Sequence, residues 1–205
     1  MRVSKIMSGS TLAVSVLLMA GLFATTTRAN EWNDRTTVKF SGPVEVPGPQ
    51  GPEVLPAGTY TLKLLGSSSD RNIVQIFDKE RTHLYATVLA IPDYRLHPAG
   101  HTIIRLYKSK NGNPAALKAW FYPGDQFGQR FVYPKSRATE IARNAGEAVP
   151  SMPDETASNM SKTIKSGNEP QASALKNAQV KAEEPSGQEV AAAQAVQDKP
   201  SGTPR

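Results

Sequence analysis

The densest group of residues that could do chemistry is the segment 120–129, Trp-Phe-Tyr-Pro-Gly-Asp-Gln-Phe-Gly-Gln. Aromatic rings give a sugar or a peptide apolar contact area, and neighbouring carboxylate and amide groups can orient such a ligand by hydrogen bonds. A core strand followed by a glycine-rich turn explains the same residues and is the simpler interpretation. If the segment does bind a ligand, the candidate binding surface consists of Trp120, Tyr122, Asp125, Gln126 and Phe127.

Acid–base groups are few, because the chain has only three histidines and no cysteine. His97 and His101 are four residues apart, and on a helix this spacing could chelate a metal ion. Pro98 and Gly100 lie between them and predict a loop instead, in which both histidines face solvent. We therefore expect no metal site and no cofactor.

Asp93 and Arg95 are two residues apart at the end of a predicted strand. Because side chains alternate along a strand, both would lie on one face, where an ion pair could form. An exposed pair of this kind contributes only about 0–1 kcal/mol to stability. We interpret the two residues as structural.

The linear signatures of common enzymes are missing. The chain contains no nucleophile elbow, no zinc-binding H-E-x-x-H, no phosphate-binding loop and no calcium-binding loop. Without cysteine there is also no disulfide, no thiol nucleophile and no lipid-anchored terminus. We assign no catalytic residue. A hydrolase or lyase would have to use Asp93, Asp125 and the histidines, and it would need at least two of them to meet in one cleft.

The elements that would position these residues are short strands. Residues 60–64 alternate apolar and polar side chains, and residues 36–41 do so similarly, which predicts strands with one buried face. Residues 73–77 are apolar on both faces, as expected of a central strand. A polar turn then leads into 83–91, so these last two segments predict a hairpin.

A second hairpin is predicted more strongly. Residues 102–107 and 115–122 flank Asn111-Gly112, and Asn-Gly favours a type I′ turn, whose central residues need positive φ. A last strand is predicted at 130–133.

A short helix, 137–143, follows that strand, and Ser136 is its predicted N-cap. The pattern indicates an all-β fold of seven to eight short strands, either an antiparallel β-sandwich or a small barrel, with one short helix after the last strand. We place this β-domain at residues 30–143.

Residues 1–29 predict a cleavable signal peptide. Arg2 and Lys5 form a basic start, residues 12–24 are uncharged and mostly apolar, and Thr27-Arg28-Ala29 precedes the predicted cut. An uncleaved anchor is the alternative, but a spanning helix needs about 20 apolar residues. The prediction is a periplasmic or extracellular protein with no membrane association after cleavage.

Residues 144–205 differ sharply in composition from the segment before them. They contain no Phe, Trp or Tyr, and they include six prolines. Such a segment has little apolar surface to bury against the entropy of ordering. The sequence therefore predicts a disordered, low-complexity tail.

The net charge of +6 is unevenly distributed along the chain. The predicted signal peptide carries +3, residues 30–143 carry +5 and residues 144–205 carry −2. Basic residues of the β-domain are scattered singly, whereas nucleic-acid-binding proteins cluster them on one face. We expect no nucleic-acid partner.

Seven segments carry a resemblance to a known family: F-S-G-P-V-E-V-P-G (40–48), L-P-A-G-T-Y (55–60), I-V-Q-I-F (73–77), A-T-V-L-A-I-P (86–92), A-W-F-Y-P-G-D (119–125), F-G-Q (127–129) and F-V-Y-P-K (131–135). Together they resemble a family of small exported proteins of unknown function found in soil bacteria such as acidobacteria. The match covers about residues 31–143, with weaker similarity at 149–153 and 185–190. The resemblance implies export and a boundary near residue 143, but it implies no activity.

Three hypotheses about function follow. The leading one is an exported, non-enzymatic β-domain that acts as a binding or structural module for an unknown ligand. The alternative is a small hydrolase or lyase acting on a cell-envelope polymer. The third is a module that docks a protein partner through an edge strand or through the tail.

Overall fold

A computed structural model describes residues 35–48, 51–65, 72–109, 112–158 and 163–196. The predicted signal peptide lies outside the described residues. None of the helices in these ranges is both long and apolar enough to cross a membrane.

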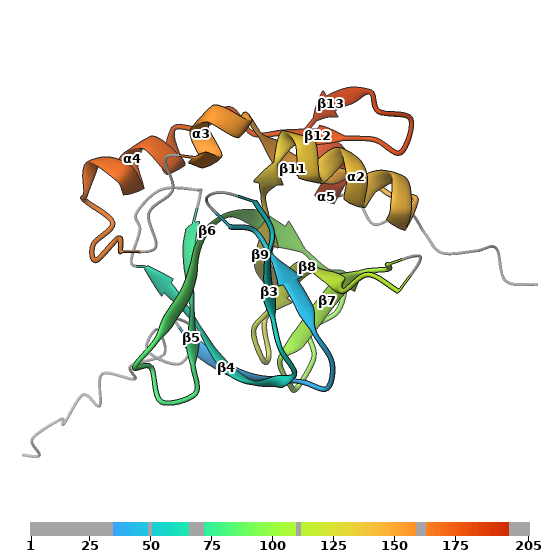
Figure 1. The fold of residues 1–205 in the computed structure, drawn as a ribbon. Helices are drawn as coiled ribbons and strands as arrows, with labels where there is room; N and C mark the ends of the chain where they lie inside the picture. Colours follow the sequence, from blue (N-terminus) through green and yellow to red (C-terminus); the bar gives the residue numbers. More distant parts are fainter. Residues whose placement is uncertain (1–34, 49–50, 66–71, 110–111, 159–162, 197–205) are drawn as a thin grey trace, which may run out of the picture.

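One large sheet contains nine strands (Figure 1): β1 (Arg35–Phe40), β2 (Val44–Val46), β3 (Glu53–Leu55), β4 (Gly58–Leu65), β5 (Asn72–Asp78), β6 (Leu84–Tyr94), β7 (Ile103–Tyr107), β8 (Ala115–Phe121) and β9 (Phe127–Phe131). Their order is β1-β4-β5-β6-β9-β8-β2-β3, and β7 also pairs with β8. All of these pairs are antiparallel except β2–β8. The predicted β-rich, largely antiparallel fold and both predicted hairpins, β5–β6 and β7–β8, are confirmed.

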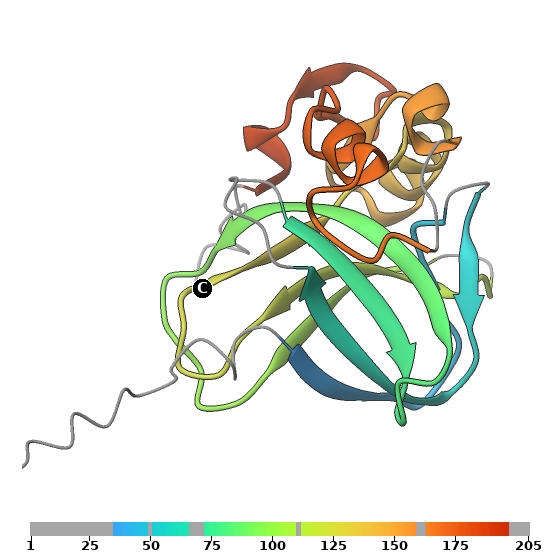
Figure 2. The same ribbon diagram turned by 90° about the vertical axis from the view of Figure 1, so that its left-hand side faces the viewer.

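The large sheet is strongly curled around its main core (Figure 2). Alternation along each strand directs every second side chain inward. The main core therefore takes Leu62 from β4, Val74 from β5, Val88 from β6, Trp120 from β8 and Phe131 from β9, all fully buried. The strand count is higher than predicted, because the short strands β2 and β3 give no periodic signal.

Helix α2 (Lys135–Ala145) follows the short strand β10 (Tyr133–Pro134). The predicted N-cap is wrong: Pro134 occupies that position and makes no capping bond. Ser136 lies inside the helix, and its backbone N–H and its hydroxyl both donate to Asp154 Oδ1 at 3.1 Å. The helix ends at Gly146, which has the left-handed conformation (φ 74°) that favours glycine.

The prediction of a disordered tail is wrong for residues 149–158 and 163–196. These residues form the strands β11 (Val149–Met152), β12 (Lys181–Glu183) and β13 (Glu189–Ala191) and the helices α3 (Asp154–Ser158), α4 (Pro170–Lys176) and α5 (Ala193–Val196). The strands pair in the order β10-β11-β12-β13 as a second sheet. These elements cover one end of the curled large sheet (Figures 1 and 2).

The C-terminal elements order because the large sheet supplies the apolar surface that they lack. Leu65, Ile73, Leu89 and Ile91, on the large sheet, form a second core with residues of the C-terminal elements. The C-terminal members of that core are Met152, Ala157, Ile164, Ala172, Leu175 and Ala178. Half of these six residues are alanines, whose small side chains give only a weak hydrophobic signal in the sequence.

A buried ion pair connects β6 and β9. Arg130 Nε donates to Asp93 Oδ2 at 2.8 Å, and the two side chains are 1% and 0% exposed. The predicted pairing of Asp93 with Arg95 is therefore wrong, because the neighbouring strand brings Arg130 to the same face. In the register, Arg130 lies opposite Ile91 and Gly128 lies opposite Asp93, so the pair is diagonal across the two strands.

Nearby groups keep Arg130 charged. Burial acts to lower the pKa of its guanidinium, but Tyr107 and Asp93 outweigh this effect and the pKa is raised. Burial also raises the pKa of the Tyr107 phenol, and the nearby Arg130 offsets this only in part. The guanidinium is therefore a permanent buried cation that requires the Asp93 carboxylate.

Replacing Arg130 by methionine tests this pair. Arg130→Met leaves a buried carboxylate without its cation, so we expect a loss of about 3–5 kcal/mol in the free energy of unfolding, measured by urea denaturation. Arg143→Met is the matched control, because Arg143 is exposed on α2 and its replacement should change stability by less than about 0.5 kcal/mol. Equal losses in the two variants would contradict this role of Arg130.

Candidate functional site

Two residues of the predicted binding surface belong to the core. Trp120 is fully buried and Tyr122 is 5% exposed, and their ring centroids are 4.7 Å apart. Gln129 Nε2 lies 3.5 Å from the Tyr122 hydroxyl, to which it donates. Neither ring can form part of a ligand-binding surface, so the core-strand interpretation holds for this half of the segment.

Of the other three predicted residues, Asp125 and Gln126 lie in the connection between β8 and β9, and Phe127 is the first residue of β9. Asp125 Oδ1 accepts a hydrogen bond from the backbone N–H of Phe127 at 3.0 Å, which closes the turn. The backbone N–H of Gly124 donates to the carbonyl of Ala99 at 2.6 Å. This bond ties the turn to the connection between β6 and β7.

Phe127 lies near two other exposed residues, Tyr94 and Leu96, which were not predicted from the sequence to form a binding surface. We call Tyr94, Leu96, Gln126 and Phe127 the aromatic surface. Tyr94 lies directly opposite Phe127 in the register, and their ring centroids are 5.6 Å apart at an interplanar angle of 62°. The side chains of Tyr94, Leu96 and Phe127 are 47%, 79% and 60% exposed, so all three present apolar surface to solvent.

Gln126 fixes the aromatic surface from both sides. Its Oε1 accepts a hydrogen bond from the Tyr94 hydroxyl at 3.1 Å, and its Nε2 donates to the carbonyl of Leu96 at 2.9 Å. The backbone N–H of Arg95 donates to the carbonyl of Gln126 at 2.9 Å. Hydrogen bonds therefore join the two connections at the aromatic surface.

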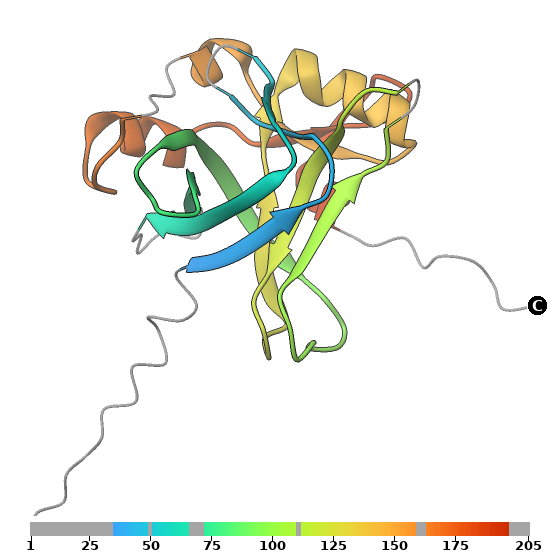
Figure 3. The same ribbon diagram turned by 60° about the horizontal axis from the view of Figure 1, so that its bottom comes forward.

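The aromatic surface continues the inner face of the sheet beyond the packed core. Alternation along β9 places Phe127, Gln129 and Phe131 on the same face, and Phe131 belongs to the main core. The β6–β7 and β8–β9 connections extend past β1 (Figure 3). Phe127 therefore lies where the inner face of the sheet opens to solvent.

Gly128 lets β9 approach β8 closely beside this surface. A Cβ atom at Gly128 would lie 2.5 Å from the Trp120 carbonyl oxygen and 2.6 Å from Cδ1 of Phe121. Any side chain here would push β9 away from β8. Phe121 is itself fully buried, with the guanidinium carbons of Arg95 and Arg105 at 5.5 and 5.2 Å from its ring centroid.

Of the five acid–base groups named from the sequence, His97, His101 and Asp125 lie on two connections that are hydrogen-bonded to each other, whereas Asp93 and His83 have other neighbours. Asp93 is buried in its ion pair with Arg130, and Asp125 accepts a hydrogen bond from Phe127 within a turn. His83 packs against the Tyr85 ring at 4.6 Å. His97 and His101 are exposed on the β6–β7 connection, as predicted. Across the described ranges, no group of three His, Asp or Glu residues is placed to hold a metal ion.

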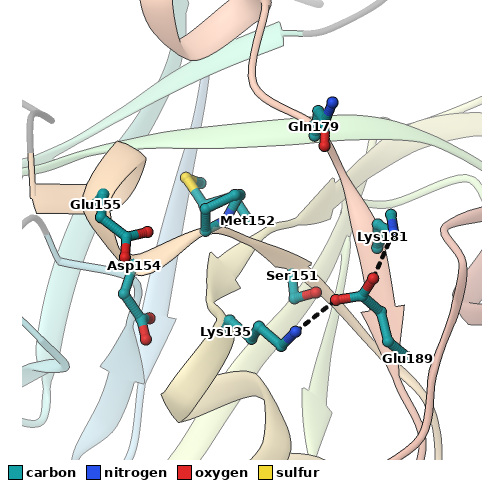
Figure 4. Close-up of a pocket in the computed structure, with 9 residues that line it drawn as sticks. Lys135, Ser151, Met152, Asp154, Glu155, Gln179, Lys181 and Glu189 are labelled. Carbon is teal, nitrogen blue, oxygen red and sulfur yellow. Dashed lines mark hydrogen bonds and ion pairs between the residues drawn. The ribbon is translucent and has the colours of Figure 1, made fainter.

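A second feature is a charged pocket of about 330 Å³ where α2, α3 and the second sheet meet (Figure 4). We call it the charged pocket, and it is lined by Lys135, Ser151, Met152, Pro153, Asp154, Glu155, Gln179, Lys181 and Glu189. The pocket was not predictable from the sequence, because eight of these nine residues belong to the C-terminal segment and meet only when that segment folds back on the large sheet.

A three-residue ion network forms one side of the charged pocket. Lys135 Nζ donates to Glu189 Oε2 at 2.6 Å, and Lys181 Nζ donates to Oε1 of the same carboxylate. Hydrogen bonds from Lys135 and Lys181 lower the pKa of Glu189 to about 2, and the hydrogen bond to Glu189 raises the pKa of Lys135. The network links α2, β12 and β13.

Comparison of the chain with protein-family models, curated proteins and solved structures found no match in any of the three. The function is therefore inferred from the geometry of the described residues.

The ion network predicts that the Glu189 carboxyl titrates at an unusually low pH. The pKa is about 2 in the folded protein and 4.5 without the lysines, so the network's contribution is complete above pH 4.5 and is lost as the pH falls through about 2. We expect the side-chain carboxyl carbon of Glu189 to titrate near pH 2 in a ¹³C NMR experiment. In a Lys135→Gln, Lys181→Gln double variant the midpoint should rise toward 4.5. A midpoint near 4.5 in the unchanged protein would contradict the network.

Proposed function

We propose that the protein is an exported, non-enzymatic binding module that holds a glycan chain on its aromatic surface. The proposal includes the finer architecture predicted from the sequence, a β-sandwich or small barrel whose open end carries the binding residues. One observation carries it. Among the described residues, the large hydrophobic side chains with strong exposure are Val54, Tyr94, Leu96, Leu106 and Phe127. Two of these, Tyr94 and Phe127, pack edge to face, and Gln126 connects Tyr94 to the backbone of Leu96.

The chemistry of the aromatic surface favours a neutral, hydroxyl-rich ligand. Its four side chains are two aromatic rings, one leucine and one amide, so none of them carries a charge. Aromatic faces can pack on the C–H faces of sugar rings, and the Gln126 amide and the Tyr94 hydroxyl can exchange hydrogen bonds with hydroxyl groups. Exposed apolar groups of this kind mark binding surfaces in soluble proteins.

An extended peptide fits the aromatic surface less well. Peptides commonly bind β-proteins by adding a strand to a free sheet edge. β9 is already hydrogen-bonded to β6 on one side and to β8 on the other. The strand beside Phe127 therefore offers no free edge, and the side chains themselves must provide the affinity.

Rigidity supports a role in binding. Because Gln126 hydrogen-bonds to the Tyr94 hydroxyl and to the Leu96 carbonyl before any ligand arrives, Tyr94 and Gln126 have less side-chain entropy to lose on association. The alternative, a hydrolase or lyase acting on an envelope polymer, has less support because Asp93 is buried in its ion pair with Arg130 and Asp125 accepts a hydrogen bond within its own turn. Export is supported by the predicted signal peptide and by the family resemblance.

The proposal is tested with the chain from Asn30 onward, mixed with insoluble peptidoglycan, cellulose or chitin and then sedimented. We expect one of these polymers to retain the protein. Phe127→Ala and Tyr94→Ala should each weaken retention by about tenfold or more, as expected for a central aromatic contact. Val54→Ala is the matched control, because Val54 is 49% exposed on β3 and should leave retention unchanged.

Three outcomes would contradict the proposal. The first is retention that survives both aromatic substitutions, which would place binding elsewhere. The second is release of soluble sugar fragments, which would favour the enzyme alternative. The third is the absence of retention by every glycan together with binding of a protein partner, which would favour docking through an edge strand.

A further inference from the structure

We propose that the outer face of β1 and β4 binds an acidic polysaccharide through the carboxylates of its sugar rings. This inference concerns a different face of the large sheet from the aromatic surface, and it does not rest on the glycan-binding proposal. It comes from the strand register, which gathers basic residues that are scattered in the sequence.

The pairing of β1 with β4 places three basic side chains on one face of the sheet. Arg35 lies directly opposite Lys63, and Lys39 lies opposite Thr59. Side chains at the alternate positions, such as Val38, point into the main core, so the three basic side chains point outward. All three are exposed. We call Arg35, Lys39 and Lys63 the basic face.

No carboxylate neutralises the basic face. Neither β1 nor β4 contains an acidic residue. Within the described ranges, the three basic side chains form no ion pair, although Lys and Arg residues elsewhere do so. Like charges directly opposite each other destabilise a sheet. The position of Arg35 opposite Lys63 is therefore unfavourable in the free protein, and a bound anion would relieve it.

The turn after β5, on one side of the basic face, adds no net negative charge. It holds Asp78 and Glu80 together with Lys79 and Arg81. The hydroxyl of Thr61, on β4, donates to the carbonyl of Lys79 at 3.4 Å, so this turn lies beside β4. The Asp78 carboxylate already accepts two hydrogen bonds.

The C-terminal segment on the other side of the basic face is also balanced. Gln75 lies opposite Lys63, and its amide donates to the carbonyl of Ile164 at 2.6 Å. The next residue, Lys165, is exposed, and Glu169 lies beside it, because Glu169 Oε1 accepts the backbone N–H of Lys165 at 2.9 Å. The excess of positive charge therefore stays on the basic face.

The shape of the sheet favours a flexible ligand. Figure 3 looks onto the outer side of β1 (blue) and β4 (turquoise), and no helix lies in front of them. Because the large sheet curls around the main core, this outer face is convex (Figure 2). A rigid duplex or a flat bilayer touches a convex face only along a short line, whereas a flexible chain can follow it.

The spacing of the charges favours a polymer that carries hydroxyl groups as well as carboxylates. Arg35 and Lys39 are about 13 Å apart along β1, at about 3.3 Å for each residue, so one small anion cannot reach both. Thr37 lies between them and is exposed. A threonine hydroxyl can exchange hydrogen bonds with sugar hydroxyls. A polysaccharide with a carboxylate on its sugar rings supplies both kinds of group.

The experiment titrates the ¹⁵N-labelled chain from Asn30 onward with short oligogalacturonates and with their methyl esters, and records amide chemical shifts. We expect the charged oligomers to shift the amides of β1 and β4 in a saturable way. The esters should bind at least about tenfold more weakly, because they carry no negative charge, and added salt should weaken binding of the charged oligomers. Equal affinity for the esters, shifts confined to the aromatic surface, or the absence of saturable shifts would overturn the proposal.

Two double variants locate the binding. Lys39→Gln with Lys63→Gln should weaken oligogalacturonate binding by about tenfold or more, because it leaves one of the three charges. Lys108→Gln with Arg143→Gln is the matched control, since it removes the same net charge from exposed positions outside the basic face and should have little effect. Equal weakening in the two double variants would show attraction to the net charge of the whole protein and would contradict the assignment.

Other polyanions test the class of ligand. Polyglutamate, a DNA duplex and phosphatidylglycerol vesicles are compared with oligogalacturonate at the same salt concentration. We expect each of them to bind more weakly, and tighter binding of any one would overturn the assignment to an acidic polysaccharide. Because these comparisons and the comparison with the methyl esters use the unchanged sequence, they remain decisive even if a variant fails to fold.

Discussion

The buried pair of Asp93 and Arg130 is the interaction on which the rest of the arrangement depends. It lies between β6 and β9, the two strands that join the β1-β4-β5 half of the large sheet to β8. A slip of one residue in this register would move one charge to the opposite face and leave its partner buried alone, at a cost of about 3–5 kcal/mol. The pair thereby sets Tyr94 opposite Phe127 and gives the aromatic surface its geometry.

Strands β6 and β9 also connect the two hydrophobic cores, which lie on opposite faces of the large sheet. Their inner faces contribute Val88 and Phe131 to the main core and then open to solvent at Phe127. Their outer faces present Leu89, Ile91 and nearby Val132 to the C-terminal elements, which cover them. Folding of the C-terminal segment onto this face also assembles the charged pocket.

How far the sequence predicts the structure differs from one element to the next. Strands with clear alternation, such as β1 and β4, were predictable, and so were the β5–β6 and β7–β8 hairpins. The partner of Asp93 was not, because a pairing between strands depends on register, and neighbours in sequence suggested Arg95 instead. The C-terminal elements were missed because their alanines become a core only against Leu89 and Ile91. Phe127 was found from composition alone, whereas Tyr94 required the pairing of β6 with β9.

The most direct test of the account is a ring-resonance NMR experiment on the chain from Asn30 onward, with a soluble fragment of whichever glycan retains the protein. The account predicts that the ring protons of Tyr94 and Phe127 shift and broaden, while those of the buried Trp120 stay unchanged. Changes confined to residues away from β6 and β9, with the rings of Tyr94 and Phe127 unaffected, would contradict the claim that this end of the sheet is the binding surface.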